Sequence, residues 1–242
     1  MSFSYEELAE IRHYIHQHPE LSGQEYQTTA FLKERLEELG IRILESGLKT
    51  GLIAEIGSGK PVVALRADID ALPILEQTNL PYQSQHPGVM HACGHDFHQT
   101  SLLGAAALLK EKEDQLEGTI RLIFQPAEEI SEGASDVLAT GLLEDVQGII
   151  GFHNIPQLKA GQLALNAGAM MAGVEKFKVT VTGVSSHAAR PDLGVDTVTA
   201  VTTMVQNLQL LISRTISPFE TAVLSITHLD VGSTWNVLPK SG

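Results

Sequence analysis

The apolar residues near the start of the chain recur at the three- to four-residue spacing of amphipathic helices. Ser4 and Glu7 form an S-x-x-E capping box that opens a first helix, and this helix ends at His18 because the next residue is a proline. A second helix is predicted over residues 25–39, followed by Gly40 at the position where a glycine commonly ends a helix. The chain is therefore expected to open with two consecutive helices.

Short, continuous apolar runs follow, and further helical patterns separate them. Such an alternation of buried strands with connecting helices is typical of an α/β sheet. Strands are predicted over residues 52–56, 61–66, 119–124 and 148–153, and helices over residues 100–116 and 135–140. A long loop rich in Pro, Gln and His is predicted over residues 71–92.

A glycine-rich turn lies between the first two predicted strands. Residues 57–60 (GSGK) look like a phosphate-binding loop, but Pro61 stands where that loop needs Ser or Thr, and Ala54 stands where it needs its first Gly. We therefore interpret the segment as a hairpin turn.

The pattern changes near Gly173. Polar and apolar residues alternate strictly over residues 175–182, a helix is predicted over 196–212, and a second alternating strand over 222–229. Strict alternation indicates a sheet with one solvated face, so this β-α-β unit is expected to begin a second, smaller domain. The predicted domains are residues 1–172 and residues 173–242.

Charge and composition narrow the class of protein. The 242 residues carry 16 Lys and Arg against 29 Asp and Glu, a formal net charge of −13, which argues against binding to nucleic acid or to an anionic membrane. No apolar run approaches the ~20 residues of a membrane span. Residues 1–7 show neither the basic nor the apolar region of a signal peptide, so we expect a cytoplasmic protein. A single cysteine excludes an internal disulfide framework.

Three of the ten histidines and the only cysteine lie together in residues 91–98 (HACGHDFH). In an extended segment, Cys93 and His95 would point to the same side, and Gly94 between them permits a close backbone approach. A thiolate and an imidazole that converge on one point suit a divalent transition metal. The alternative is a histidine-rich loop beside a buried cysteine that binds nothing.

Further candidate ligands follow the predicted strands. Glu128 and Glu129 come directly after the strand that ends at residue 124, where one Glu could bind a metal and the other could take a proton from water. Asp68 closes another strand and could orient a metal ligand, and His153 closes a third. The alternatives are a surface Glu pair, a turn aspartate and a structural histidine.

Four motifs, which contain the candidate ligands named above, carry a resemblance to a known family. They are residues 66–73 (RADIDALP), 91–96 (HACGHD), 125–129 (QPAEE) and 151–154 (GFHN). They resemble the metal-site motifs of the aminoacylase/carboxypeptidase-G type of metallopeptidases. More narrowly, they are similar to its amidohydrolase branch, with hippurate hydrolase, plant auxin-conjugate hydrolases and bacterial N-acetyl-amino-acid deacetylases. The segments 16–22, 186–188 and 236–239 also match, so the similarity covers the whole chain.

The resemblance implies an α/β fold: a mixed-sheet co-catalytic metallopeptidase domain with a smaller α+β lid domain inserted. It implies two divalent metal ions (Zn, Mn or Co) and hydrolysis of an N-acyl amino acid, for which we expect a short acyl group such as acetyl. Its ligands would be Cys93, His95, Glu129 and His153. Glu128 would be the general base, and Asp68 an auxiliary catalytic residue.

The resemblance also assigns roles to the second domain. His187 would contact the carbonyl oxygen of the substrate and Asn236 its carboxylate, and the lid would form a homodimer. Members of the family continue beyond the point that corresponds to Gly242 and gain a last metal-ligand histidine there, so we expect this sequence to be a C-terminally truncated form.

Two alternatives to a metal-dependent amidohydrolase stay open. One is a cysteine hydrolase in which Cys93 is the nucleophile, because Cys93 precedes a predicted helix; this leaves Glu128 and Glu129 unexplained. The other is an inactive metal-binding or dimerising remnant of the enzyme, and under this alternative the chain alone would be weakly active or inactive.

Overall fold

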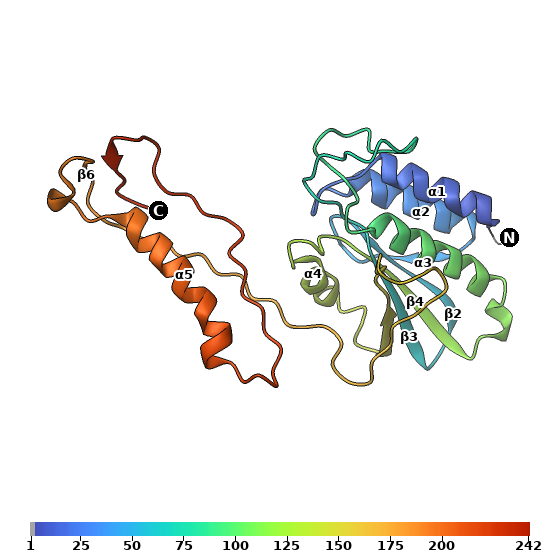
Figure 1. The fold of residues 1–242 in the computed structure, drawn as a ribbon. Helices are drawn as coiled ribbons and strands as arrows, with labels where there is room; N and C mark the ends of the chain where they lie inside the picture. Colours follow the sequence, from blue (N-terminus) through green and yellow to red (C-terminus); the bar gives the residue numbers. More distant parts are fainter. Residues whose placement is uncertain (1–2) are drawn as a thin grey trace. The chain divides into compact units, whose positions relative to one another are not determined.

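The structure is a computed structural model that describes residues 3–242. Its internal contacts divide the chain into two compact units, Met1–Leu163 and Ala164–Gly242, each described below by itself (Figure 1). The sequence pattern changes at Gly173 instead, so the predicted boundary at 172/173 stays a prediction. The prediction that no signal peptide is present rests partly on Met1 and Ser2, which lie outside the described residues.

A five-stranded mixed sheet forms the centre of the first unit (Figure 1). Its strands are arranged in the order β1-β2-β4-β3-β5, in which β1 and β2 pair antiparallel, β2 and β4 pair antiparallel, and β3 runs parallel to both β4 and β5. The strands are β1 (Arg42–Leu44), β2 (Leu52–Ser58), β3 (Val62–Asp68), β4 (Gly118–Gln125) and β5 (Val146–Gly151). The predicted α/β class with a mixed sheet is confirmed.

The turn at residues 57–60 is not a hairpin, and that prediction is wrong. Strand β4 lies between β2 and β3, since Ile120 is the register partner of Ile56 on one side and of Val63 on the other. Strand β4 is buried over residues 121–125 and occupies the centre of the sheet, where both of its edges are hydrogen-bonded. A glycine-rich turn indicates only that the chain reverses direction locally. Which strands become neighbours in the sheet depends instead on which strand is buried at its centre.

Helices cover both faces of this sheet. Alternate strand residues face opposite sides, and one set, which includes Ala54 and Leu122, packs with Leu36 and Leu103 from two helices. The other set, which includes Ile53 and Ile123, packs with a residue of the short helix α4. The helices of the first unit are α1 (Tyr5–Gln17), α2 (Tyr26–Glu38), α3 (His95–Lys110), the 3₁₀ helix η1 (Glu113–Gln115) and α4 (Gly133–Ala139).

The helix ends test the capping predictions. The predicted capping box at Ser4 and Glu7 is present in both directions. Helix α3 begins at His95, five residues before the predicted start at Thr100, because Gly94 adopts a left-handed φ of 91° and turns the chain into the helix. The polar residues of its first turn are buried and carry no apolar periodicity, so the hydrophobic pattern could not reveal them.

The second unit contains little regular structure. It has the two-residue strands β6 (Ser186–His187) and β7 (Val237–Leu238), the 3₁₀ helix η2 (Pro191–Leu193) and the helix α5 (Thr197–Thr215). The predicted helix is therefore present, and Asp196 caps it through the N–H groups of Val198 and Thr199. The regular strands predicted over residues 175–182 and 222–229 are not formed. Only the end of the first segment is paired: Val181 exchanges backbone hydrogen bonds with Gly242, and Thr182 forms an isolated antiparallel bridge with Ser241.

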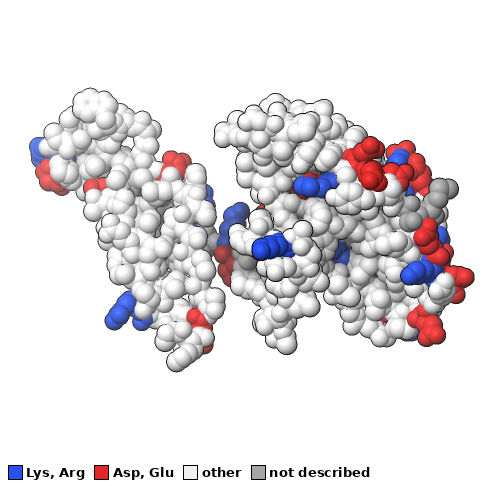
Figure 2. All heavy atoms as spheres, turned by 45° about the vertical axis from the view of Figure 1, so that its right-hand side comes forward, with Lys and Arg blue, Asp and Glu red and all other residues white. Residues whose placement is uncertain are grey.

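Charged residues are unevenly distributed on the face of the molecule shown in Figure 2. Asp and Glu gather in patches, and the Lys and Arg side chains on this face are separated from one another rather than joined in a continuous basic surface. Among residues 3–242, no helix is both long enough and apolar enough to cross a membrane.

Candidate metal centre

The predicted site residues of the first unit gather at one edge of the sheet. The parallel strands β3, β4 and β5 run in the same direction, so the segments that follow them leave the sheet at the same edge, where α/β proteins place their ligands. Asp68 is the last residue of β3, Glu128 and Glu129 follow β4, and His153 follows β5. The beginning of helix α3 brings His95 to these strand ends.

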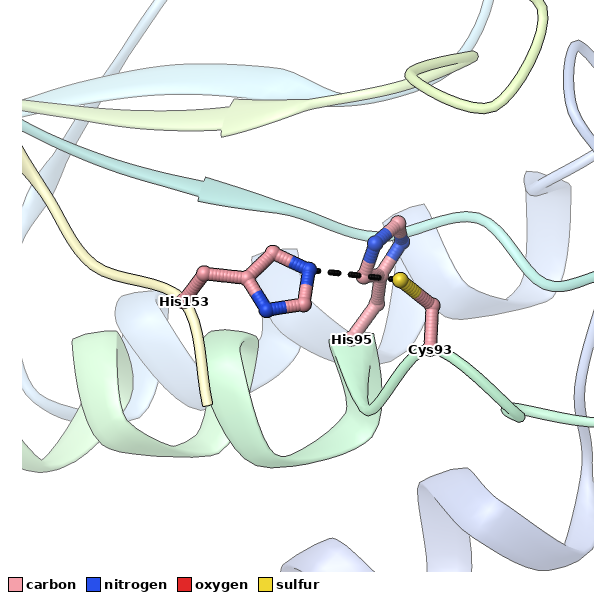
Figure 3. Close-up of side chains that lie close together, drawn as sticks. All are labelled: Cys93, His95 and His153. Carbon is pink, nitrogen blue, oxygen red and sulfur yellow. Dashed lines mark hydrogen bonds between the residues drawn. The ribbon is translucent and has the colours of Figure 1, made fainter. Parts of the chain in front are cut away.

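Cys93, His95 and His153 point toward one another (Figure 3). The Sγ of Cys93 lies 3.2 Å from Nε2 of His153, and one ligand atom from each of the three residues lies within 4.8 Å of the others. Gly94 makes this approach possible, since a Cβ at this position would lie 2.4 Å from Oδ1 of Asn154. The segment thus needs glycine both for its φ angle and for its close packing.

Three carboxylates surround the same imidazole. Nε2 of His95 lies 3.7 Å from Oδ2 of Asp68, 3.9 Å from Oε2 of Glu128 and 3.8 Å from Oε1 of Glu129. Among the described residues, Nε2 of His95 and Oε1 of Glu129 are buried atoms without a hydrogen-bond partner. Because buried polar atoms are nearly always paired, two unpaired ligand atoms that face each other fit a cation between them.

Asp70 holds the ring of His95, a role that the sequence reasoning did not give it. Nδ1 of His95 donates to the carbonyl oxygen of Asp70 at 2.9 Å and lies 3.2 Å from its Oδ1, so in the neutral ring Nε2 carries no proton and can act as a ligand. The other carboxylate oxygen of Asp70 accepts from the N–H of Glu129 at 2.9 Å and from the hydroxyl of Ser22 at 2.6 Å. The RADIDALP motif contains Asp70, but only the fold shows which of its two aspartates forms hydrogen bonds with His95.

Asp68 has a different set of partners. Its Oδ1 accepts from Nδ1 of His98 at 2.6 Å, and its Oδ2 accepts from Arg66 at 2.7 Å. His98 in turn accepts the N–H of Asn154 at Nε2, at 3.0 Å. Through His98, Asp68 therefore links the end of β3 to Asn154, the neighbour of His153. The predicted role of Asp68 in orienting a metal ligand stays a prediction.

Burial and neighbouring charges shift the pKa values of this site. Burial and the neighbouring carboxylate of Glu129 raise the pKa of the Cys93 thiol to about 12. Burial and Glu129 also raise the pKa of Glu128. Burial opposes ionisation of Asp68, but hydrogen bonding to His98 and the charges of His95 and Arg66 outweigh it and lower the pKa of Asp68 to about 2.

The pKa of Cys93 bears on the cysteine-hydrolase alternative. A nucleophilic cysteine needs a lowered thiol pKa, which a neighbouring cation or helix N-terminus usually provides. The surroundings of Cys93 act in the opposite direction and raise its pKa, whereas a cation bound beside the thiol would favour the thiolate. The arrangement therefore favours a metal ligand over a nucleophile.

His187 and Asn236, the two predicted substrate contacts, lie side by side within the second unit. In the antiparallel pair β6–β7, His187 is opposite Val237, and the N–H of Ala188 donates to the carbonyl oxygen of Asn236 at 3.0 Å. Nδ1 of His187 accepts from the N–H of Ala189 at 3.1 Å, so its ring proton is on Nε2. Two residues distant in sequence thus lie close together, His187 in β6 and Asn236 directly before β7.

Comparison with known proteins gives concordant results. The family described as "Peptidase family M20/M25/M40" matches residues 64–228. The chain is 50% identical over 235 residues to the N-acetyl-L-cysteine deacetylase of Bacillus subtilis, covering 96% of this chain and 56% of that enzyme. It is 40% identical over 231 residues to the N-acyl-L-amino acid amidohydrolase of Geobacillus stearothermophilus, covering 94% of this chain and 62% of that enzyme.

A solved structure agrees with these sequence relatives. A Bacillus subtilis protein described as a dinuclear metal binding peptidase from the M20 family superposes with a TM-score of 0.73 at 44% identity, over 97% of this chain and 61% of that chain. The chain thus spans little more than half the length of these relatives. The resemblance read from the four motifs is confirmed, and the chain belongs to peptidase family M20/M25/M40.

Proposed function

We propose that the chain is a metal-dependent amidohydrolase that cleaves the amide bond of N-acyl amino acids. The observation that carries this proposal is the buried, unpaired Nε2 of His95, which faces Glu129 and lies in one cluster with Cys93 and His153. The names of the two sequence relatives, a deacetylase and an N-acyl-L-amino acid amidohydrolase, support the reaction class.

Cys93, His95, Glu129 and His153 would hold two divalent metal ions. This mixed set of sulfur, nitrogen and oxygen ligands suits Zn²⁺, Co²⁺ or Mn²⁺ better than Mg²⁺ or Ca²⁺, which prefer oxygen alone. Bound metal ions would polarise the scissile carbonyl and lower the pKa of water at the site.

Glu128 would carry the proton. Its side chain is half-buried and lies beside Glu129, which together raise its pKa toward the range useful to a general base. Its carboxylate would take a proton from the attacking water, whose oxygen adds to the carbonyl carbon. The same proton would then pass to the amide nitrogen as the C–N bond breaks, which releases the carboxylic acid and a free amino acid. The acid then loses the second proton of the former water, to the released amine or to solvent, and becomes a carboxylate.

The second unit would contribute substrate contacts. Nε2–H of His187 is the correct tautomer to donate to the carbonyl oxygen of a substrate, and Asn236, directly before β7, would bind its carboxylate. We further propose that residues 173–242 belong to a lid domain that forms a homodimer, and that the preferred acyl group is acetyl.

Removal and return of metal tests the proposed function. Exhaustive chelation should abolish hydrolysis of N-acetyl amino acids, and Mn²⁺, Co²⁺ or Zn²⁺ should restore it. A panel of N-acetyl, N-benzoyl and indole-acetyl amino acids would identify the acyl group. Full activity after complete metal removal would refute the proposal, and metal binding without turnover of any of these substrates would favour a metal-binding protein instead.

A further inference from the structure

Glu25 is a fully buried carboxylate outside the metal cluster. It precedes helix α2 and is 0% exposed. Its side chain does not cap its own helix, because Glu20 accepts from the N–H groups of Thr28 at 2.8 Å and Gln27 at 3.1 Å in its place. Since burying a carboxylate is costly unless it is well hydrogen-bonded, the side chain is expected to serve another part of the fold.

The two oxygens of Glu25 bind two loops that are distant in sequence. Oε1 accepts from the N–H of Ala127 at 2.8 Å, and Oε2 accepts from the hydroxyl of Thr50 at 2.7 Å. Ala127 is buried and has a left-handed φ of 49°, a conformation that L-residues other than Asn and Asp rarely adopt. Glu25 therefore stabilises an unfavourable backbone conformation at the residue directly before Glu128.

The Glu128–Glu129 segment is held from both sides. Upstream, Glu25 binds the N–H of Ala127; downstream, Asp70 binds the N–H of Glu129 at 2.9 Å. The carbonyl oxygen of Ala127 accepts from the N–H of Gly133 at 3.1 Å, which closes the loop that carries both glutamates. The two side chains that hold this backbone segment, Glu25 and Asp70, thus come from distant parts of the chain.

We propose that Glu25 is a positioning residue that fixes the backbone of Ala127 and thereby directs Glu128 and Glu129 toward Nε2 of His95. This inference rests on the proposed function, because it assumes that these glutamates serve a metal site. It assigns a role to a residue that contacts neither metal nor substrate.

Three variants separate positioning from simple packing. Glu25→Met keeps the size of the side chain but removes both hydrogen bonds. Glu25→Gln can keep both, since its amide oxygen accepts from Ala127 and its amide nitrogen donates to Thr50. Thr50→Val is the matched control, because it removes the other hydrogen bond of Glu25 and leaves the contact with Ala127.

The readout is Co²⁺ affinity together with the visible absorption spectrum of the bound Co²⁺, with thermal unfolding of each variant measured in parallel. Glu25→Met should weaken Co²⁺ binding by about 10–100-fold and change the spectrum, as the loss of outer hydrogen bonds commonly does in metal sites. Glu25→Gln and Thr50→Val should stay within about threefold of the wild-type affinity, well below that range.

Several outcomes would overturn the proposal. Wild-type affinity and spectrum in Glu25→Met would do so, as would an equal loss in Thr50→Val, because the effect would then come from packing. If Glu25→Met does not fold, the rate of hydrogen exchange at the Ala127 amide of the wild-type chain tests the proposal instead. Slow exchange is expected, and exchange as fast as at the exposed Gly47 would contradict the proposal. A wild-type chain that binds no Co²⁺ would refute the proposed function instead, so the two failures are distinguishable.

Discussion

The two units of the chain differ in how their side chains are supported. In Met1–Leu163, alternate strand residues pack against helices on both faces of the sheet, and buried polar groups such as Asp70 and Glu25 have several partners each. In Ala164–Gly242, all of which the structure describes, Val201 is the one buried hydrophobic residue. A segment with a regular hydrophobic pattern thus forms a strand or helix where other segments pack against it. A segment with the same kind of pattern stays irregular where no other segment packs against it.

The candidate functional residues divide along the same line. The predicted ligands and Glu128 lie in the first unit, where buried neighbours fix their positions. His187 lies in β6 of the second unit and Asn236 directly precedes β7, and backbone hydrogen bonds hold these two segments together. We therefore expect substitutions in the first unit to change metal binding or proton transfer, and substitutions in the second to change turnover alone.

Glu128→Gln should have the largest effect on turnover. The amide cannot accept a proton from water, so the rate of hydrolysis should fall by about 10²–10⁴-fold, the usual contribution of a general base. Metal content, measured by elemental analysis, should not change. Loss of metal together with activity would make Glu128 a ligand and not the base.

His187→Ala tests the role of the second unit. Removal of one donor to a developing oxyanion typically costs about 10²–10³-fold in rate. Steady-state kinetics with an N-acetyl amino acid would measure this loss, and His228→Ala offers a control histidine in the same unit that lies outside the motifs. A turnover number equal to that of the wild type would show that His187 has no role in the mechanism. A change in metal affinity would contradict the proposal that residues of the second unit affect turnover alone.

Asp70→Asn should weaken metal binding without abolishing it. The substitution removes the carboxylate that holds Nδ1 of His95 and the N–H of Glu129, and the loss of such an outer partner typically costs about 10–100-fold in metal affinity. Competition with a chelator of known affinity would measure the change. Unaltered affinity would mean that the backbone carbonyl of residue 70 is enough to hold His95, and that the N–H of Glu129 does not need a carboxylate acceptor.

The smallest effect is expected at an exposed apolar residue of the second unit. Leu211 on helix α5 is 43% exposed, so Leu211→Ala should change the free energy of unfolding by no more than about 0.5 kcal/mol. The matched substitution Leu103→Ala on helix α3, where the side chain is fully buried, should cost about 2–5 kcal/mol. Urea unfolding would compare the free energies of unfolding of the two variants. An equal loss of stability in Leu211→Ala would show that Leu211 is packed as tightly as a core residue.

The sequence predicts the parts of the fold that local chemistry determines. The capping box at Ser4, the strands that carry continuous apolar runs and the positions of Glu128, Glu129 and His153 after strand ends all follow from patterns of a few residues. The four motifs at residues 66–73, 91–96, 125–129 and 151–154 are sufficient to indicate the family.

What the sequence does not reveal depends on distant partners. Strand β4 separates β2 from β3, and no local signal in the turn at 57–60 indicates this insertion. The choice between Asp68 and Asp70 as the partner of His95 depends on how β3 meets helix α3. The role of Glu25 is equally hidden, since its hydrogen-bond partner Ala127 lies about a hundred residues further along the chain.

The measurement that tests the central claim most directly is an anaerobic titration of the wild-type chain with Co²⁺, compared with a Cys93→Ser variant. We predict that the wild-type chain binds two Co²⁺ ions and shows a thiolate-to-cobalt charge-transfer band, and that this band is absent in the variant. A wild-type chain that binds no Co²⁺, or a spectrum that Cys93→Ser leaves unchanged, would contradict the assignment of this cluster as the metal centre.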